Sequence, residues 1–445
     1  MRPRPVFAQA ARTFYSAARN AGVQRGVQIP KGQTLIIVAG RDPTLFPGGM
    51  ESFARAHGRA ALKAGYEPHH FCVGTKSRVE TTPFGVLHVA NSPFRPLRGI
   101  MIAAHGHYIV DAINRFVGQQ RGPCLIHSLG PWSGVGAAAA RRLASRGVES
   151  ITLATPYSTY EHETRAKVRG VTRVHGRWTK LKLRCELLWI RLAVNPSERR
   201  GLRQSRLVLV NYDSVRSILR AAYGDAIKFG KMTYASEMAF LENGTECEAP
   251  PAMLTDLEPK EAPLIVAVSR QDARKGLDVL LRALAQLRQG GARFRACLVG
   301  GGPLLEKHRA YAAELGLLSC TAITGRVTDA YAFLCHADIF ALPSLEEGSG
   351  SISLLEAMQA RVAPVVSRVD GLPEDVTDGE SALLTAPGDA ADLARALGLL
   401  LDDAGLRARL AQRAYAIYRD RFSAEAFSAD LQSAYTKLGF APLRP

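Results

Sequence analysis

The chain has 445 residues, of which 47% are apolar and 22% charged, and its formal net charge is +17. This length exceeds one ordinary hydrophobic core and the composition excludes general disorder, so we expect two domains of roughly 200 residues each. No apolar run reaches the length of about 18 residues that a membrane-spanning helix needs, and residues 1–30 lack the apolar core of a secretory signal. We therefore expect a cytoplasmic protein.

The positive charge lies in the first half of the chain. Residues 1–250 contain 36 Lys and Arg against 16 Asp and Glu, a net of +20, whereas residues 251–445 contain 21 against 24, a net of −3. This asymmetry indicates an anionic partner for the first half: nucleic acid, an acidic glycan or a membrane surface. A general bias towards Arg is the alternative explanation.

The first half of the chain alternates short apolar runs with helical stretches. Residues 1–30 form a basic leader, which is either an amphipathic helix on a membrane or an unstructured segment. A helix is expected at 50–64, after a Gly/Pro loop. Strands are expected at 35–39, 100–103, 125–126, 151–153 and 207–210. This alternation over residues 31–250 predicts a doubly wound parallel sheet.

A second alternation begins after a linker containing prolines and acidic residues, at 251–263. It extends over residues 264–420, with a helix at 276–288. Its strands are expected at 264–268, 296–299, 339–342 and 364–366. The sequence therefore predicts two Rossmann-like α/β domains, each with its ligand site at the carboxyl ends of its strands.

The strongest motif runs from Ala337 to Glu380. It predicts a strand, a Ser/Gly loop and a helix from about Ile352, with Glu347 before the helix and Glu356 in its second turn. A helix N-terminus attracts phosphate, and a carboxylate beside it can accept two hydrogen bonds from a ribose diol. Solvated acids on a surface helix are the alternative.

This stretch resembles the retaining GT-B transferases of glycosyltransferase family 4, whose signature reads roughly P-S-x-x-E-G-x-G-x-x-x-L-E-A-M. A downstream V-G-G-x-P-E stretch of the family corresponds to residues 369–374. The resemblance covers residues 264–436 well and 34–70 more loosely. The matching signature residues are Pro343, Ser344, Glu347, Gly348, Gly350, Leu355, Glu356, Ala357 and Met358.

The resemblance implies a GT-B fold, in which two Rossmann-like doubly wound parallel-sheet domains face each other across a cleft. Residues 31–250 would form the acceptor domain and residues 264–420 the donor-binding domain. A helix within 421–445 is expected to pack back on the N-terminal domain.

Arg270 and Lys275 match the family's G-R-x-x-x-x-K-G segment, in which the two cations hold the donor diphosphate. The leaving diphosphate gains charge as the glycosidic bond breaks, so two cations there can replace a metal ion. The chain has no convincing Asp-x-Asp motif and no C-x-x-C pair among its seven cysteines. We expect no metal and no cofactor. Glu347, placed by the resemblance at the sugar hydroxyls, is the third expected catalytic residue.

The other expected donor-binding residues share a position in a glycine turn, in a loop after a strand or at a helix N-terminus. Glu356 would bind the ribose. The rest are Gly48, Gly49, Gly300, Gly301, Arg326, Val327, Gly350, Ser351 and Ile352.

The chain departs from the family pattern at several positions. Eight residues, not seven, separate Glu347 from Glu356, and a bulge in 348–351 would absorb the extra one. Arg361 and Asp370 each stand where the family has glycine. On the acceptor side, Tyr157 occupies the family's histidine position and His127 is a second candidate, although a histidine at a strand end is more often structural.

The resemblance implies a retaining, hexosyltransferase-type enzyme that moves a sugar from a nucleotide-diphosphate sugar to an acceptor hydroxyl. The acceptor would be a glycan or a lipid-linked molecule in cell-surface polysaccharide or glycolipid synthesis. One alternative is a GT-B-fold enzyme of another reaction type, such as a nucleotide-sugar epimerase or a phosphorylase. The other is a phosphate-polymer or nucleic-acid-binding protein, but the chain lacks an RNA-binding aromatic signature, so no nucleic acid is expected.

The stretch Arg165 to Arg206 contains 13 Lys and Arg against Glu186 and Glu198, with apolar residues around Trp189. This composition suits a helix that lies on anionic lipid, and would make the protein peripheral on the inner face of the membrane. A core helix with a basic solvated face is the alternative.

Overall fold

The computed structural model describes residues 33–45, 48–94, 102–118, 124–170, 177–241 and 250–442. The leader expected at 1–30 lies outside these ranges. Contacts divide the described chain into two compact units. Unit 1 comprises the described residues up to Thr155, Ser197–Val208 and those from Ser428 onward, and unit 2 comprises Pro156–Pro196 and Leu209–Phe427.

The described residues form two β-sheets. The first sheet contains β1 (Thr34–Arg41), β2 (Glu67–Gly74), β3 (Arg78–Thr82), β4 (Gly85–Asn91), β5 (Cys124–Leu129), β6 (Ser150–Thr155), β7 (Leu207–Val210) and β8 (Phe229–Lys231). The second sheet contains β9 (Leu264–Val268), β10 (Arg295–Val299), β11 (Thr321–Gly325), β12 (Ile339–Leu342), β13 (Ala363–Ser367) and β14 (Leu383–Thr385).

Both sheets have the strand order of a doubly wound fold. The first has the order β3-β4-β2-β1-β5-β6-β7-β8 and the second the order β11-β10-β9-β12-β13-β14. The strands from β4 to β7 in the first sheet and those of the second sheet pair in parallel, whereas β3 is antiparallel to β4. The strand order reverses direction between β1 and β5, and again between β9 and β12, which are the points where such sheets bind ligands. The predicted α/β class with two doubly wound parallel sheets is confirmed.

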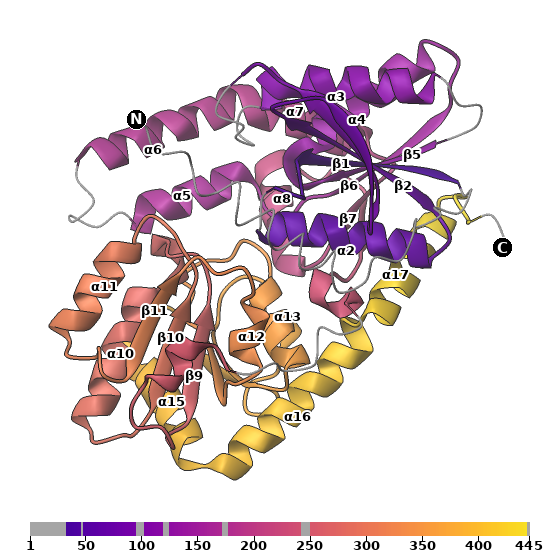
Figure 1. The fold of residues 1–445 in the computed structure, drawn as a ribbon. Helices are drawn as coiled ribbons and strands as arrows, with labels where there is room; N and C mark the ends of the chain where they lie inside the picture. Colours follow the sequence, from indigo (N-terminus) through magenta and orange to yellow (C-terminus); the bar gives the residue numbers. More distant parts are fainter. Residues whose placement is uncertain are drawn as a thin grey trace. The chain divides into compact units, whose positions relative to one another are not determined.

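Helices cover both faces of the sheets (Figure 1). In unit 1, α3 and α4 pack on one face of the first sheet and α2 on the other. The helices of the first half are α2 (Gly49–Lys63), α3 (Ile102–Val117), α4 (Ser133–Ala144), α5 (Tyr160–Gly170), α6 (Arg177–Trp189), α7 (Asn195–Gln204) and α8 (Asp213–Tyr223).

In unit 2, α10 packs against α11 and α15, while α13 packs against α16 and β13 (Figure 1). These helices belong to the second half of the chain, which contains α9 (Ala252–Thr255), α10 (Leu277–Gln289), α11 (Leu305–Glu314), α12 (Tyr331–Leu334), α13 (Ile352–Gln359), α14 (Leu372–Asp375), α15 (Ala390–Asp402), α16 (Ala404–Arg421) and α17 (Ala424–Thr436).

The second sheet is buried on both faces. Ile265, Val266, Leu298 and Phe340 are almost completely excluded from solvent. Continuous apolar runs suit parallel strands with helices on both sides, because neither face of the strand meets water. The strands expected at 264–268 and 339–342 have the same bounds as β9 and β12, so these two predictions are confirmed.

The strand expected at 100–103 is wrong. Ile102 begins α3, and residues 100 and 101 lie outside the described ranges. The apolar residues Ile109, Ile113 and Val117, buried inside unit 1, continue the run at helical spacing. A short apolar run does not distinguish a buried strand from the start of a buried helix. Here the spacing of the apolar residues after Ile102 identifies the helix.

A cluster of buried side chains lies inside unit 1, where the end of α17 packs. The Tyr435 hydroxyl is 2.7 Å from Nε2 of His57 and 2.8 Å from Nδ1 of His127. Nε2 of His127 lies 2.7 Å from the Thr155 hydroxyl. Burial lowers the pKa of His127 to about 3, so the imidazole is neutral at ordinary pH.

Candidate active site in unit 2

The second sheet brings two charged loops together at its switch point. One loop, 269–276, follows β9, and the other, 343–351, follows the neighbouring strand β12. Both strands end at the same edge because they are parallel. The backbone N–H of Leu345 donates to the carbonyl of Arg274 over 2.8 Å, which ties the two loops directly. This is where an open parallel sheet presents a ligand site.

Lys275 and Glu347 form an ion pair between these loops. The Lys275 Nζ lies 2.5 Å from Glu347 Oε2, and the side chains are 12% and 5% exposed. Burial lowers the pKa of Lys275, but the Glu347 carboxylate opposes this shift and favours the charged ammonium. The ion pair thus keeps a positive charge in a largely buried position at the edge of the sheet.

Gly276 allows this close approach. It has a φ of +62°, and a Cβ added to it would lie 2.0 Å from the carbonyl oxygen of Pro343. No other residue could occupy this position without moving the two loops apart. The glycine after Lys275 therefore serves the geometry of the site.

Glu347 is held on several sides. Its Oε1 accepts a hydrogen bond of 2.5 Å from the Ser344 hydroxyl. Its backbone N–H and that of Gly348 both donate to Asp370 Oδ2, over 2.7 and 2.6 Å. Each carboxylate oxygen has a second lone pair, so Glu347 can still accept from a hydroxyl of a bound molecule.

Helix α13 begins beside this pair. Gly350 precedes it, Ser351 is its N-cap residue and Ile352 its first residue, as expected. Glu356, in the second turn, accepts a hydrogen bond of 2.5 Å from the Ser236 hydroxyl through its Oε1. The helix N-terminus and the two glutamates thus lie on one connected segment.

The ring of Tyr212 packs against two glycines of the site. A Cβ at Gly350 would lie 1.9 Å from the Tyr212 hydroxyl oxygen, and a Cβ at Gly371 would lie 2.5 Å from its ring carbons. The Tyr212 hydroxyl donates to Asp375 Oδ2 over 2.7 Å. Burial raises the pKa of Asp375 to about 7, although this hydrogen bond opposes the shift.

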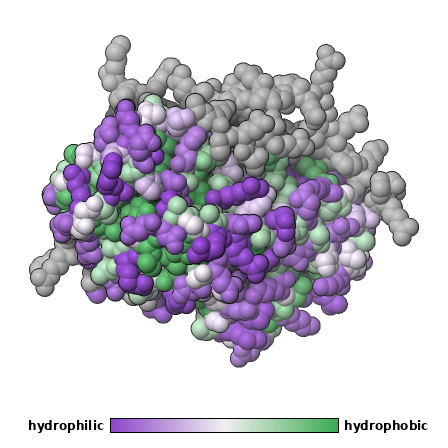
Figure 2. Space-filling view, turned by 90° about the horizontal axis from the view of Figure 1, so that it is seen from below, coloured by the Kyte–Doolittle hydropathy of each residue, from purple (hydrophilic) through white to green (hydrophobic). Residues whose placement is uncertain are grey.

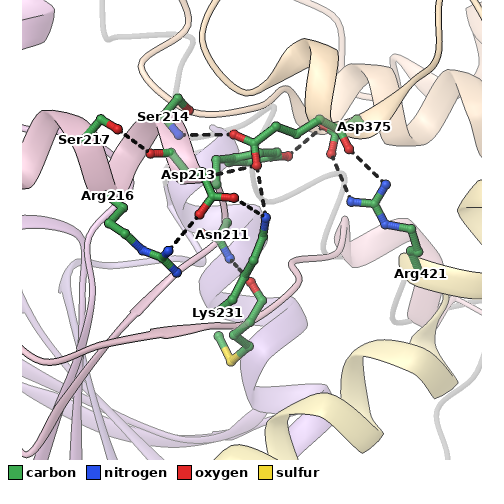
Figure 3. Close-up of polar contacts among 11 residues, drawn as sticks. Asn211, Asp213, Ser214, Arg216, Ser217, Lys231, Asp375 and Arg421 are labelled. Atoms are coloured by element: carbon green, nitrogen blue, oxygen red, sulfur yellow. Dashed lines mark hydrogen bonds and ion pairs between the residues drawn. The ribbon is translucent and has the colours of Figure 1, made fainter.

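A polar network anchors the short helix α14 (Figure 3). Glu374 accepts from the backbone N–H groups of Asp213 and Ser214, at 3.0 and 3.1 Å, and from Lys231 at 3.1 Å. The Arg421 guanidinium donates to the Glu374 carbonyl over 2.9 Å and faces Asp375 at 4.0 Å. Glu374 and Asp375 are therefore tied to residues of α8, β8 and α16.

The glycine turn expected near a donor lies at the end of β10. Gly300 has a φ of +131° and its N–H donates to the Gly325 carbonyl over 3.0 Å. A Cβ at Gly301 would lie 3.2 Å from Cβ of Arg326. The structure therefore brings this turn together with Arg326 and, beside it in the chain, Val327.

Arg270 pairs with a different carboxylate. Its side chain is 64% exposed and pairs with Asp272 at 3.7 Å. Gly48 and Gly49 lie in unit 1, at the start of α2, where Gly48 is the N-cap residue. The role of these three residues at a donor stays a prediction.

The two acceptor-side candidates have different surroundings. His127 is fully buried within β5, and both its ring nitrogens lie within hydrogen-bond distance of Tyr435 or Thr155, so its contacts are those of a structural residue. Tyr157 follows β6, is half-buried and belongs to unit 2. Their roles at an acceptor stay predictions, and the contacts of His127 do not favour its role.

Several residues of the site carry no role in the sequence-based prediction: Ser344, Ser236, Tyr212 and Asp370. Ser344 belongs to the signature, three residues before Glu347, a spacing that could have paired them. Ser236 and Tyr212 belong to no sequence motif. Their partners in the site are more than 100 residues away in the chain, so no local pattern could have indicated these contacts. In the described ranges, no three His, Cys, Asp or Glu side chains are grouped as a metal ion would need.

The sequence matches the family model of the glycosyl transferases group 1 over residues 255–417. The lipopolysaccharide core biosynthesis glycosyltransferase LpsD of Rhizobium meliloti (strain 1021) is 31% identical over 240 residues, 52% of this chain and 68% of that protein. A GDP-mannose-dependent alpha-(1-6)-phosphatidylinositol monomannoside mannosyltransferase of Mycolicibacterium smegmatis is 34% identical over 151 residues, 32% of this chain and 40% of that protein.

Solved structures share the fold over nearly the whole chain. Sucrose-phosphate synthase of Thermosynechococcus elongatus has a TM-score of 0.71 at 20% identity, covering 92% of this chain and 99% of that one. HepE of Anabaena, solved with UDP and glucose, has a TM-score of 0.64 at 18% identity, covering 91% and 100%. The predicted GT-B fold is therefore confirmed. The chain belongs to the group 1 glycosyl transferases and is a glycosyltransferase.

Proposed function

We propose that this enzyme transfers a sugar from a nucleotide-diphosphate sugar to an acceptor hydroxyl with retention of anomeric configuration. The observation that carries the proposal is the Lys275–Glu347 ion pair at the switch point of the second sheet. A buried cation there suits a leaving diphosphate, whose charge increases as the bond to the sugar breaks. The neighbouring carboxylate suits the hydroxyls of the sugar.

Each residue has a defined part in the proposed reaction. Lys275, joined by the exposed Arg270, stabilises the diphosphate, while Glu347 orients the sugar and Glu356 accepts from the ribose. The bond between the anomeric carbon and the diphosphate oxygen breaks, and the acceptor oxygen bonds to that carbon on the same face. The acceptor proton passes to the departing diphosphate oxygen, so no protein base is required.

The test begins with the donor. A set of nucleotide sugars is screened by thermal shift, because a ligand that binds the folded state raises its melting temperature. The stabilising donor is then incubated with candidate acceptors, and NMR of the anomeric proton assigns the configuration of the product. Retention with release of nucleoside diphosphate is expected. An inverted product, or conversion of the donor alone to another nucleotide sugar, would contradict the proposal.

We further propose that the acceptor is a glycan or lipid-linked molecule at the inner face of a membrane, where the enzyme is peripheral. The names of the two relatives above refer to lipopolysaccharide core and to a phosphatidylinositol mannoside, which supports this acceptor class. In the described part of the chain, no helix is long and apolar enough to cross a bilayer.

An exposed apolar stripe on α6 and the following π-helical turn supports membrane docking. Figure 2 shows hydrophilic side chains mixed with apolar ones on the face that it draws, and single exposed apolar residues are ordinary on protein surfaces. On α6 and the turn after it, however, several recur at helical spacing, while Ile190 and Val194 are buried. The stripe contains Leu181 (50% exposed), Cys185, Leu188 (58%), Trp189 (41%) and Leu192 (70%).

Exposed Lys182 and Arg184 lie on the same helix, so the stripe combines apolar residues with positive charge. Such a face gains from acyl chains and from anionic headgroups together. Co-sedimentation with vesicles of phosphatidylglycerol and phosphatidylcholine tests it. Binding should need the anionic lipid and weaken as salt rises.

Replacing Leu188 and Leu192 together by Ser should lower vesicle affinity by about tenfold or more. Leu318→Ser is the matched control, because Leu318 is 63% exposed in unit 2 but far from α6 in sequence. If the wild-type protein ignores anionic vesicles at low salt, or the control loses as much affinity as the double variant, membrane docking through α6 is wrong.

A further inference from the structure

Asp370 has a backbone conformation that ordinarily belongs to glycine. Its φ is +45°, and only one other described non-glycine residue, Arg361, has a positive φ. Such a conformation strains a residue with a Cβ. The related V-G-G-x-P-E stretch has glycine at this position, so this chain accepts a strain that glycine would avoid. An acidic side chain in such a place calls for a compensating contact.

That contact is with the loop of Glu347. Asp370 Oδ2 accepts the backbone N–H groups of Glu347 and Gly348, at 2.7 and 2.6 Å. In the reverse direction, the N–H of Gly371 donates to the carbonyl of Ser349 over 3.1 Å. Three hydrogen bonds therefore join residues 347–349 to residues 370–371.

The same loop contains the additional residue of this chain. Eight residues lie between Glu347 and Glu356, where the related signature has seven. The loop turns sharply before α13, since Gly348 has a φ of +82°. Backbone N–H groups that a turn exposes at a buried position need an acceptor, and the carboxylate of Asp370 supplies one for two of them.

A histidine faces the other oxygen of the Asp370 carboxylate. His162 of α5 faces Asp370 Oδ1 at 4.0 Å and Glu346 at 3.2 Å, leaving Oδ2 directed at the loop. Beyond Gly371, the network of Figure 3 anchors Glu374 and Asp375. Asp370, which accepts the hydrogen bonds from the loop, therefore belongs to a segment that is bound to α8 and α16.

We propose that Asp370 is a positioning residue for Glu347, and that it and the additional loop residue depend on each other. The carboxylate holds the turn that the longer loop creates, and so keeps the Glu347 side chain beside Lys275. This inference rests on the proposed function insofar as Glu347 acts on the donor sugar. The part concerning loop geometry can be tested without any activity.

The kinetic test combines residue 370 with loop length. Asp370→Gly should lower kcat by about tenfold or more, since a misplaced orienting group weakens the transition state. Its affinity for the free nucleoside diphosphate should change by less than about twofold, because that ligand makes no use of a sugar-orienting group. Asp370→Asn should retain most of kcat, since the amide oxygen accepts the same two N–H groups.

Deletion of Ser349 alone should also lower kcat, whereas Asp370→Gly combined with this deletion should recover most of it. The combined variant has the spacing and the glycine of the related signature. Arg361→Gly is the matched control: it removes the same kind of backbone strain away from this loop, and its effect should simply multiply with that of the deletion. Losses that multiply for Asp370→Gly as well would overturn the mutual dependence.

Hydrogen exchange measures the contact independently of catalysis. Peptides covering 343–351 should exchange faster in Asp370→Gly and at the wild-type rate in Asp370→Asn. Unchanged exchange in Asp370→Gly would overturn the inference even if transfer is confirmed. Faster exchange in an enzyme that transfers no sugar would instead leave the positioning contact standing and reject the proposed function.

Discussion

The two sheets share a strand order at their switch points but place their polar side chains differently. In the first sheet, His127 lies within β5, and its bonds to Tyr435 and Thr155 satisfy a polar group inside the core of unit 1. In the second sheet, Lys275 and Glu347 lie beyond the carboxyl ends of β9 and β12. A polar residue inside a buried strand serves stability, whereas one beyond the strand end can meet a ligand.

The largest expected effect is at the Lys275–Glu347 pair. Lys275→Ala should reduce transfer by about 100-fold or more, because it removes charge stabilisation at the leaving diphosphate. It should also destabilise unit 2 by about 3–5 kcal/mol, since Glu347 is left as an unpaired buried charge. Steady-state kinetics and urea unfolding measure the two effects.

A variant that removes both charges separates chemistry from folding. Lys275→Met with Glu347→Gln should regain most of the stability while transfer stays low. If the double variant transfers sugar as fast as the wild type, the ion pair contributes to stability only. The polar residues of the second sheet would then have the same structural role as those of the first.

Glu356→Gln should weaken nucleoside diphosphate binding by ~1.5–3 kcal/mol, the scale of a hydrogen bond to a charged group. Isothermal titration calorimetry gives the affinity directly. Glu306→Gln, a change at an exposed glutamate of α11 in the same unit, is the control and should leave affinity unchanged. Equal affinities for the wild type and Glu356→Gln would place the ribose elsewhere.

Acid should destabilise unit 1 through its buried histidines. Burial lowers the pKa of His127 and His70 to about 3 each, below the ordinary value of 6.5. The unfolded chain therefore binds more protons, and stability falls as the pH falls from about 6.5 towards about 3. The loss at pH 5 relative to pH 8 is about 2 kcal/mol for each such histidine.

Urea unfolding at both pH values tests this expectation. His127→Gln should show a smaller loss between pH 8 and pH 5 than the wild type, whereas the exposed His107, changed to Gln, should leave the loss as it was. Equal losses in all three proteins would show that His127 titrates normally.

Tyr435→Phe is expected to have the smallest effect. It removes the hydroxyl that lies between His57 and His127, and should lower the stability of unit 1 by about 1–2 kcal/mol. Saturating transfer rates should stay at the wild-type value if this cluster is purely structural. A fall in kcat without a fall in stability would instead indicate that the buried histidines of unit 1 contribute to catalysis.

Sequence patterns predicted the parts of this fold whose signals are local. β9 and β12 are unbroken apolar runs, and α13 starts at Ile352 as its glycine-rich approach indicates. The start of α3 was mistaken for a strand because four apolar residues fit either element. Partners distant in the sequence leave no such signal: nothing around Ser236 indicates Glu356, 120 residues further on.

The glycine positions illustrate the same limit within the site. The comparison with the family signature identified Arg361 and Asp370 as departures, and both have a positive φ, of 58° and 45°. The sequence could not show what offsets the strain. The Arg361 guanidinium lies 4.2 Å from the ring centroid of Tyr415, and Asp370 binds the N–H groups of Glu347 and Gly348.

The Tyr212 ring has a consequence for attempts to change the specificity of this enzyme by mutagenesis. Any side chain at Gly350 or Gly371 would overlap the ring, at 1.9 and 2.5 Å. A library that varies only these two positions should therefore yield misfolded proteins almost throughout. Varying them together with a smaller residue at 212 opens that space, but it also leaves Asp375 without its hydrogen-bond donor. Useful variants at positions 350 and 371 should therefore be sought in combination with a change at residue 212.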